Sequence, residues 1–440
     1  MGAYPVPDER NCGVCMLRKV EKFIPALTVI FFVLGVFVAA LSRSAARLVD
    51  KSESVFLDGY SYAAPLAIFL VLAPYLARTL RLREEVKFGG YMLRWLAVRR
   101  LLSCFWGCIF TALIFQLPLL PHQHNSLRLS LISSLKSLCW MAAHSSFFFA
   151  IYAAIIVSLI SLKWQALSGL LDKVLSAVEN SGQYFQLVIP IFMLAVGAYV
   201  YGLPDRIGSQ LHLQEPGAGY SGIVNFLGMK IDSHVPKDCI LFYLISALLV
   251  GIACFIWHFF LILLTRNKVK SFSIKSYFAN YWIKVYPLLW ATSSEALATP
   301  LNLYLTKTHY PQIKDEIRQF VVGMGSYLNI NGTLICVFVM LGVVANVIGF
   351  RLSFMELLFC VPIVFLIGYG VPGIPGELVL FAGPIAMLLN LPQAILPAFL
   401  ALYCGLQLGL PDSFRSGNNS TDNVLCALLL NDAYEKKFQP

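Results

Sequence analysis

Long apolar stretches alternate with short polar segments along the first half of the chain. Five stretches hold few charged residues and lie at about 22–43, 61–78, 98–119, 131–162 and 183–203. A helix needs roughly 20 apolar residues to cross the hydrocarbon core of a bilayer, so each stretch predicts a transmembrane span. A sixth span is predicted at about 237–265, after an amphipathic surface helix at 163–185 and an exposed loop at 204–236.

After residue 277, polar and helix-breaking residues interrupt the apolar stretches. Residues 278–306 and 354–391 each consist of two short apolar arms around a tip, TSSEALATP in the first and GYGVPGIPGE in the second. The arms have about ten to fourteen residues, too few to cross a bilayer, so each segment predicts a hairpin that enters the membrane and turns back. The span between them, 321–340, has a polar centre at 329–333 that is expected to unwind.

These interruptions indicate a binding site. Irregular backbone survives at membrane depth only where it is buried in protein or lines a cavity. Two interrupted segments in corresponding positions of a hydrophobic chain are the best sequence indication of a transporter's binding site. Here each hairpin is followed by a polar or interrupted span, which predicts an internal repeat built around one site.

The stretch LPDSFRSGNNSTDNV (410–424) supplies polar side chains to that site. On a helix, five of its residues share one face: Asp412, Arg415, Ser416, Asn419 and Asn423. One central arginine or aspartate costs about 2.5–3.5 kcal/mol in a membrane helix, so this stripe is expected to face protein or water. Arg415 suits a carboxylate and Asp412 suits an ammonium group. The alternative is an Asp412–Arg415 ion pair that only holds helices together.

Composition agrees with a membrane protein, because 58% of the residues are hydrophobic and only 13% are charged. The net charge of +10 comes from basic residues that concentrate at 81–100 and 265–275. This distribution predicts cytoplasmic loops, with both termini cytoplasmic, rather than nucleic-acid binding. The polar N-terminus predicts no cleaved signal peptide. Cys12 and Cys15 have metal-ligand spacing but no second pair, so no transition-metal site is predicted.

Four motifs in order resemble those of the dicarboxylate/amino acid:cation symporters, the family that includes the glutamate transporters. They are the serine-rich tip TSSEALATP, NINGT at 329–333, GIPG at 373–376 and the D-x-x-R-S-x-x-N pattern at 412–419. The resemblance implies an all-α membrane protein with eight transmembrane spans, two re-entrant helical hairpins, inverted repeats and an elevator mechanism. It also implies a homotrimer, with moving transport domains on a fixed scaffold.

The resemblance also implies a division of the chain. Residues 1–97 would hold the N-terminal tail and scaffold spans 1 and 2, residues 98–124 span 3 of the transport domain, residues 125–235 scaffold spans 4 and 5 with the exposed loop, and residues 236–440 the core of the transport domain.

The function implied is symport of acidic amino acids (glutamate or aspartate) or C4-dicarboxylates across the cell (inner) membrane, coupled to Na⁺ and/or H⁺, with no enzyme activity and no cofactor. The implied substrate-binding residues are Ser293, Ser294, Glu295, Ile330, Thr333, Ile374, Pro375, Gly376, Asp412, Arg415, Ser416 and Asn419. The implied cation-binding residues are Gly325, Asn329, Asn331, Asn419 and Asn423. Glu295 and Asn423 favour dicarboxylates, whereas Asp412 favours amino acids.

Two departures from the family pattern concern the driving ion. Asn331 and Asn423 stand where relatives carry sodium-binding aspartates, and a neutral amide holds a hard cation less strongly than a carboxylate. We therefore expect weaker sodium coupling, with Glu295, Glu377 or Asp422 as candidate proton carriers.

Three rival functions are weighed against transport. The GYG at 368–370 is reminiscent of a potassium filter, but a neighbouring arginine-bearing helix would repel cations, so a channel is disfavoured. A membrane enzyme is disfavoured because nucleophilic catalysis would need a base near Ser293 or Ser294, and no histidine lies in the hairpins or the last two spans. A non-transporting binding receptor is the third rival.

Overall fold

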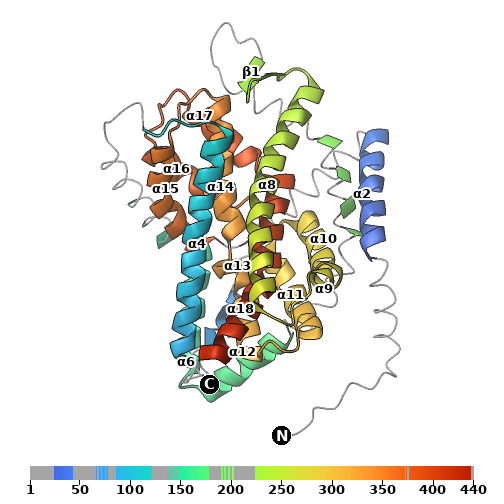
Figure 1. The fold of residues 1–440 in the computed structure, drawn as a ribbon, viewed down its shortest axis with the longest axis vertical. Coiled ribbons are helices and arrows are strands. Elements are labelled where there is room, and N and C mark those ends of the chain that lie inside the picture. Colours follow the sequence, from blue (N-terminus) through green and yellow to red (C-terminus); the bar gives the residue numbers. More distant parts are fainter. Residues whose placement is uncertain are drawn as a thin grey trace.

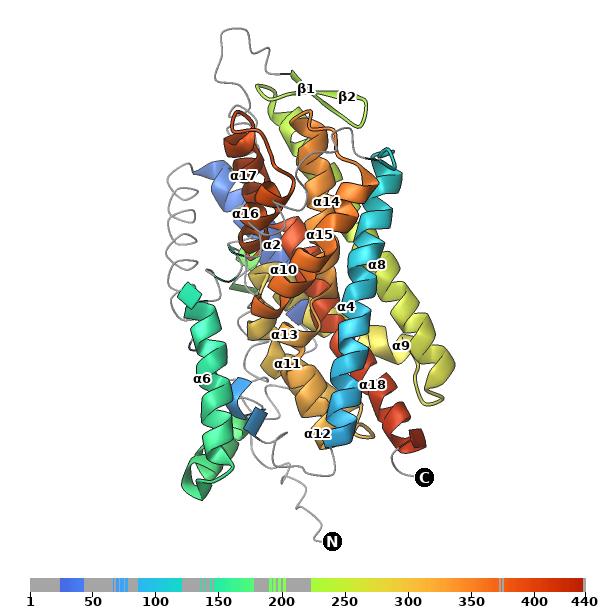
Figure 2. The ribbon, with the colours of Figure 1, turned by 90° about the vertical axis from the view of Figure 1, so that its left-hand side faces the viewer.

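The computed structural model describes residues 24–42, 86–120, 146–177, 223–371, 373 and 376–437, together with scattered residues within 66–77, 136–144 and 190–202. The described chain is mainly a bundle of long helices with shorter broken helices packed beside them (Figures 1 and 2). The predicted spans at 61–78 and 183–203 lie largely outside the described residues. Cys12 and Cys15 lie wholly outside them.

Six helices lie on predicted membrane spans: α2 (Ile24–Leu41), α4 (Val86–Ile114), α6 (Ser146–Ser161), α8 (Pro236–Lys268), α14 (Asn331–Val347) and α18 (Leu410–Lys437). Among the described helices, α4 and α8 are long and apolar enough to cross a membrane by length and composition. Large apolar side chains point outward along α8, with Leu248 55% exposed and Phe260 60% exposed. Such a surface suits contact with lipid rather than with water.

The first predicted hairpin is present as two helices that meet at a break. It comprises α9 (Ile274–Tyr277), the π-helical turn η2 (Phe278–Trp282), α10 (Ile283–Thr292) and α11 (Glu295–His309). Ser293 ends α10 in the left-handed region, with φ of 46°. Ser294 then caps α11, because its side chain accepts a hydrogen bond from the backbone N–H of Leu297. The serine-rich tip therefore forms the turn that the sequence predicted.

The second predicted hairpin is also present. It comprises α15 (Phe354–Ile367), the 3₁₀ turn η4 (Gly368–Gly370) and α16 (Val379–Leu388). A capping box of Ser353 and Glu356 starts α15. At the tip, Gly373 and Gly376 have φ of 67° and 73°, values that favour glycine.

The span between the hairpins is broken at its predicted polar centre. It begins as α12 (Asp315–Arg318), η3 (Gln319–Gly323) and α13 (Gly325–Leu328), and it resumes as α14 after Asn329 and Ile330. A further short helix, α17 (Leu396–Gly405), precedes α18 and was not predicted as a separate element.

Two predictions about the first half of the described chain need correction. The segment predicted as an exposed loop contains a two-stranded antiparallel sheet, β1 (Ile223–Phe226) and β2 (Met229–Asp232). Leu227 and Gly228 both have positive φ, which suits the tight turn of a hairpin. In addition, α4 begins at Val86 rather than near residue 98. Two arginines assigned to a basic connecting segment, Arg99 and Arg100, are consequently buried inside this helix.

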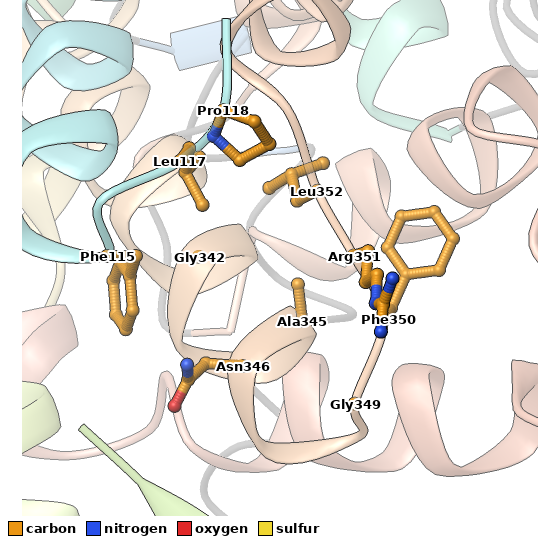
Figure 3. A pocket seen from close by; sticks show the side chains of 10 residues that line it. All are labelled: Phe115, Leu117, Pro118, Gly342, Ala345, Asn346, Gly349, Phe350, Arg351 and Leu352. Atoms are coloured by element: carbon orange, nitrogen blue, oxygen red, sulfur yellow. The ribbon is translucent and has the colours of Figure 1, made fainter. Parts of the chain in front are cut away.

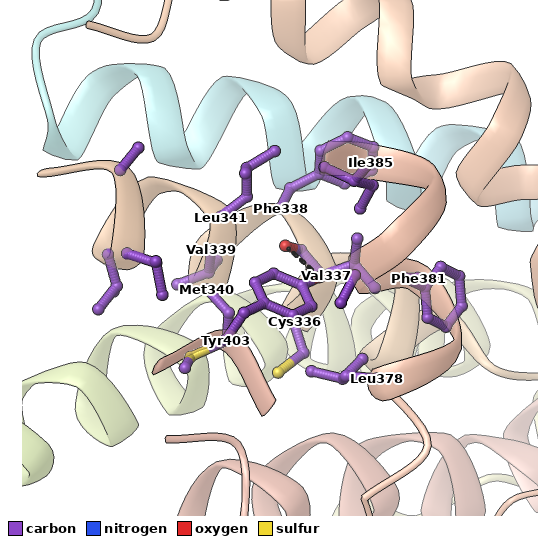
Figure 4. Packing of buried hydrophobic residues seen from close by; sticks show 14 of the residues in the cluster. Cys336, Val337, Phe338, Val339, Met340, Leu341, Leu378, Phe381, Ile385 and Tyr403 are labelled. Atoms are coloured by element: carbon purple, nitrogen blue, oxygen red, sulfur yellow. Dashed lines mark hydrogen bonds between the residues drawn. The ribbon is translucent and has the colours of Figure 1, made fainter. Parts of the chain in front are cut away.

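The core is organised around α14, in which every residue except Asn346 is buried. Helix α4 packs along α14, α8 packs along α18, and α14 contacts α18. Apolar side chains of α14 pack against α16 and α17, where the Tyr403 hydroxyl donates a hydrogen bond to the Val337 carbonyl at 3.2 Å (Figure 4).

The buried apolar residues form two clusters, and a layer of polar side chains lies between them along three helices. On α4, Arg99 and Arg100 lie between Leu96 of one cluster and Cys104 of the other. His258 lies in the same way between Cys254 and Leu261 on α8. The polar stripe of α18 comes before Val424, where the apolar part of that helix begins.

Candidate functional site

The polar stripe of α18 is buried inside the protein. Every residue from Asp412 to Asn423 is buried except Phe414, which is partly exposed. The stripe contacts α14, both hairpins and α8. It faces protein, as the cost of polar groups at membrane depth requires.

Arg415 is at the centre of one group of contacts, which we call the arginine site: Arg415, Asp412, Glu377, Thr333, Glu295 and Asn419. The Arg415 Nε donates to Asp412 Oδ1 at 2.7 Å. Its Nη1 donates to Thr333 Oγ1 at 3.0 Å and forms an ion pair with Glu377 Oε1. Both ion-paired carboxylates are buried, so the Arg415 charge is compensated within the protein.

The two hairpin tips meet over this arginine. The backbone N–H of Glu295 donates to the Gly373 carbonyl at 3.0 Å, and the Ser294 hydroxyl donates to the same oxygen at 3.3 Å. In the second tip, the N–H of Gly376 donates to Asp412 Oδ2 at 2.8 Å, and that of Gly373 donates to Glu377 Oε2 at 2.8 Å. The second hairpin is thus tied both to the first hairpin and to α18.

Asn419 joins the broken span to the first hairpin. Its amide nitrogen donates to Glu295 Oε1 at 2.7 Å and to Thr333 Oγ1 at 2.9 Å, while its oxygen accepts from the Gly332 N–H at 2.5 Å. A side chain at residue 332 would collide with the Arg415 carbonyl, so only glycine allows this close approach. The second oxygen of Glu295, Oε2, is buried with no hydrogen-bond partner among the described residues.

The remaining predicted substrate residues have different surroundings. Ser416 donates to the Ser293 carbonyl at 3.1 Å, which brings both residues to the first tip. The Ile330 side chain instead points toward Gly368, at the end of an arm of the second hairpin. Ile374 and Pro375 lie outside the described residues. Glu377 was predicted only as a proton carrier, and the structure places it directly on Arg415.

The predicted cation-binding residues also come together, in a group that we call the asparagine cluster: Gly325, Asn329, Asn331, Asn419 and Asn423. The Asn329 amide nitrogen donates to the Asn419 carbonyl at 3.0 Å and to Asn423 Oδ1 at 2.8 Å. The Asn331 amide nitrogen donates to Asn329 Oδ1 at 2.5 Å. The Gly325 carbonyl accepts from the Asn329 N–H at 2.8 Å.

Arg99 of α4 enters this cluster, a contact that sequence reasoning missed. Its Nη1 donates to Asn329 Oδ1 at 3.2 Å, and its Nη2 pairs with Asp422 Oδ2 at 2.8 Å. The other oxygen of Asp422 lies 2.6 Å from His258 Nδ1, and His258 Nε2 lies 3.1 Å from the Tyr277 hydroxyl. This chain of contacts joins α4, α18, α8 and the start of the first hairpin.

Residues 233–433, which contain both hairpins and the polar stripe, match the model of the sodium:dicarboxylate symporter family. This part of the chain belongs to that family. Its members are integral membrane transporters of small anionic substrates, and the match over this part of the chain indicates a symporter-type transporter. A comparison with curated proteins finds no match.

Sodium appears in the family's name, so we asked whether the asparagine cluster of this symporter suits a sodium ion. A hard cation needs several oxygen ligands with free lone pairs. The central oxygen of the cluster, Asn329 Oδ1, already accepts from Arg99 and from Asn331, which uses both of its lone pairs. The Arg99 guanidinium, which contacts the central Asn329, would repel a second cation. The cluster as arranged therefore does not fit sodium.

Arg100, the next residue of the symporter's helix α4, is also fully buried. None of its three side-chain nitrogens has a hydrogen-bond partner among the described residues. Its guanidinium carbon lies 3.7 Å from the centre of the Tyr369 ring, next to the second hairpin's tip. This cation–π contact is the main compensation for its charge within the described chain.

A surface pocket of about 270 Å³ is lined by none of these polar residues (Figure 3). It is lined by the end of α4, the end of α14 and the segment that leads into α15, with Asn346 and Arg351 as its most polar side chains. It contains none of the predicted site residues.

Proposed function

We propose that this symporter carries a small acidic amino acid, or a C4-dicarboxylate, through the membrane in symport with protons. The observation that supports the proposal is Arg415, a buried guanidinium where both hairpin tips and the broken span meet. Such a group recognises carboxylates, and movement of the tips above it would open and close the route to it.

The carboxyl groups around Arg415 favour an amino acid over a simple dicarboxylate. Asp412 and Glu377 pair with the guanidinium, and Glu295 reaches the same site through Asn419. Three acids around one arginine would repel a substrate that carries only negative charge. A substrate ammonium group at Asp412 would offset this repulsion while its carboxylate binds Arg415.

Glu377 is our candidate for the proton carrier. The charged groups that face it are Arg415 and Asp412 of α18 and Glu295 of α11. The ionised Glu377 side chain occupies the same Arg415 nitrogen that a substrate carboxylate would need. Protonation weakens this ion pair, so a proton and the substrate would bind together.

We further propose the elevator arrangement of the family, with a trimeric scaffold and cytoplasmic termini. In support, α4 packs along α14, and both α14 and the first hairpin pack against α18, so these elements could move as one unit. Contacts between the tips would open and close on each side in turn.

The test is uptake of labelled aspartate, glutamate and succinate by proteoliposomes, with wild type compared to Arg415→Lys. Lysine keeps the charge but loses the planar fork that binds a carboxylate through two bonds. We expect saturable wild-type uptake, best for the amino acids, and at least about a tenfold loss in the variant. Arg351→Lys, in the surface pocket, is the matched control. Saturable binding without any flux would indicate a receptor instead.

A further inference from the structure

The asparagine cluster already holds a positive charge that belongs to the protein. Arg99 is only 7% exposed, and its guanidinium donates to Asn329 Oδ1 and Asp422 Oδ2. Amide and carboxylate oxygens are also the ligands that a sodium ion would use. The guanidinium thus occupies the coordination that an external cation would need.

The amides of the cluster are oriented toward this group. Both hydrogens of the Asn329 amide nitrogen are used by oxygens of α18, on Asn419 and Asn423, so the Asn329 oxygen faces Arg99. The rings of Trp95 and Trp257 lie 5.2 and 5.9 Å from the guanidinium carbon. Aromatic faces at this distance stabilise a cation.

The charge balance of the cluster points the same way. Its side chains at residues 331 and 423 are neutral asparagines. Asp422 is the carboxylate that pairs with Arg99 beside the asparagine cluster, and both side chains of this ion pair are buried. Within the described chain, the cluster and its ion pair therefore carry no net negative charge that would attract a further cation.

We propose that Arg99 is a built-in cation that takes the place of sodium at the asparagine cluster. It holds the break at Asn329 and Ile330 together, as a bound ion would, but it is tethered to α4 and never leaves. This group of residues then stores no energy from a sodium gradient. The inference deepens the proposed function, because it concerns the coupling ion of the same transporter.

The experiment measures the melting temperature of the full chain in detergent, in sodium chloride and in choline chloride of equal concentration. Wild type and Arg99→Lys should have no sodium site at the cluster. Any shift of their melting temperatures between the two salts should therefore persist when Asn423→Ala is added. Arg99→Ala leaves Asp422 and the amide oxygens without their cation. Its melting temperature should rise by a few degrees, in a saturable way, when either sodium or guanidinium ion is added.

Two matched controls test the assignment. Arg100→Ala removes the adjacent arginine of the same helix, which does not contact the cluster, so this variant should gain no response to sodium or guanidinium. Adding Asp422→Asn to Arg99→Ala removes the carboxylate that has lost its arginine, and the double variant should lose most of the gained response.

A sodium-dependent shift of the wild type that disappears in Asn423→Ala would overturn the proposal, even if Arg99→Ala cannot be purified. A stable Arg99→Ala that responds to neither ion would also overturn it. Melting requires no substrate and no flux, so a failure of the proposed transport activity would leave this readout unaffected.

Discussion

A single residue, Glu377, gives the arginine site its unusual character. The second hairpin places this carboxylate on the arginine that resembles the family's substrate-binding residue. Gly373 and Thr333 hold it there by donating hydrogen bonds to its two oxygens, each at 2.8 Å. The side chain therefore acts in our proposal both as a competitor of the substrate and as the proton carrier.

Neutralising Glu377 should separate these roles. In Glu377→Gln the internal competitor is uncharged, so we expect at least about a tenfold tighter apparent affinity for aspartate near neutral pH, since an ion pair of this kind is worth more than 1.4 kcal/mol when buried. In our proposal wild type takes up a proton together with the substrate, so its affinity should fall as pH rises. Substrate affinity of the variant, measured from pH 5 to 8, should no longer follow pH.

Glu356→Gln is the matched control for this variant, since Glu356 caps the same hairpin's helix α15 away from the arginine site. It should keep the wild-type pH profile. An unchanged profile in Glu377→Gln as well would mean that another group carries the proton.

Removing the Arg415 charge altogether should affect stability as well as transport. In Arg415→Ala, Asp412 and Glu377 would be buried without their cation, a change that typically costs about 3–5 kcal/mol. We expect a melting temperature several degrees below that of wild type. Adding Glu377→Gln should restore part of the loss, because one unpaired charge is removed; equal melting of both variants would count against the ion pair.

Among the structural elements, the tip of the second hairpin depends on its glycines. Gly376 has φ of 73° and donates its N–H to Asp412, so alanine there should cost about 1–2 kcal/mol and weaken the closed tip. We expect Gly376→Ala to reduce uptake by roughly tenfold. Gly383→Ala is the control, because residue 383 lies within α16 with open space around it. Similar uptake by both variants would argue against the tip as a gate.

The contact between α4 and the second hairpin gives another prediction. Arg100 has no hydrogen-bond partner among the described residues and lies against the Tyr369 ring. Tyr369→Leu should therefore lower the free energy of unfolding by about 1–2 kcal/mol, whereas Tyr369→Phe keeps the ring face and should change it little. Thermal melting of the two variants checks this, and equal destabilisation would exclude a cation–π origin.

Several elements could be predicted from sequence because their signals are local. The hairpins and the broken span carry their breakers within a few residues, at 292–294, 329–331 and 373–376. The helical spacing of the α18 stripe likewise predicted one polar face, and α18 is buried along that face.

The partners of that face could not be predicted in the same way. The Arg99–Asp422 pair joins residues 323 positions apart, and nothing in either neighbourhood specifies the other. Arg99 and Arg100 lie where the basic segment 81–100 and the predicted span 98–119 overlap, so the sequence did not show whether they lie inside the bundle; the helix in fact begins at Val86. A signal was nevertheless available, because both arginines directly precede an apolar run with no intervening turn.

At the scale of the whole molecule, the polar groups form one layer between two apolar clusters. The arginine site and the asparagine cluster lie in this layer and share Asn419 and α18. A buried polar layer is costly unless its members satisfy one another, and most of the side chains described here do so. This mutual satisfaction means that substrate binding must break contacts within the protein, which links binding to movement of the tips.

The most direct test of the central claim is uptake of labelled aspartate by proteoliposomes, with pH and sodium gradients imposed separately. An inward proton gradient in sodium-free buffer should drive accumulation by wild type, and Glu377→Gln should exchange aspartate without being driven by that gradient. Accumulation that requires sodium, rises cooperatively with its concentration and ignores the pH gradient would contradict the account.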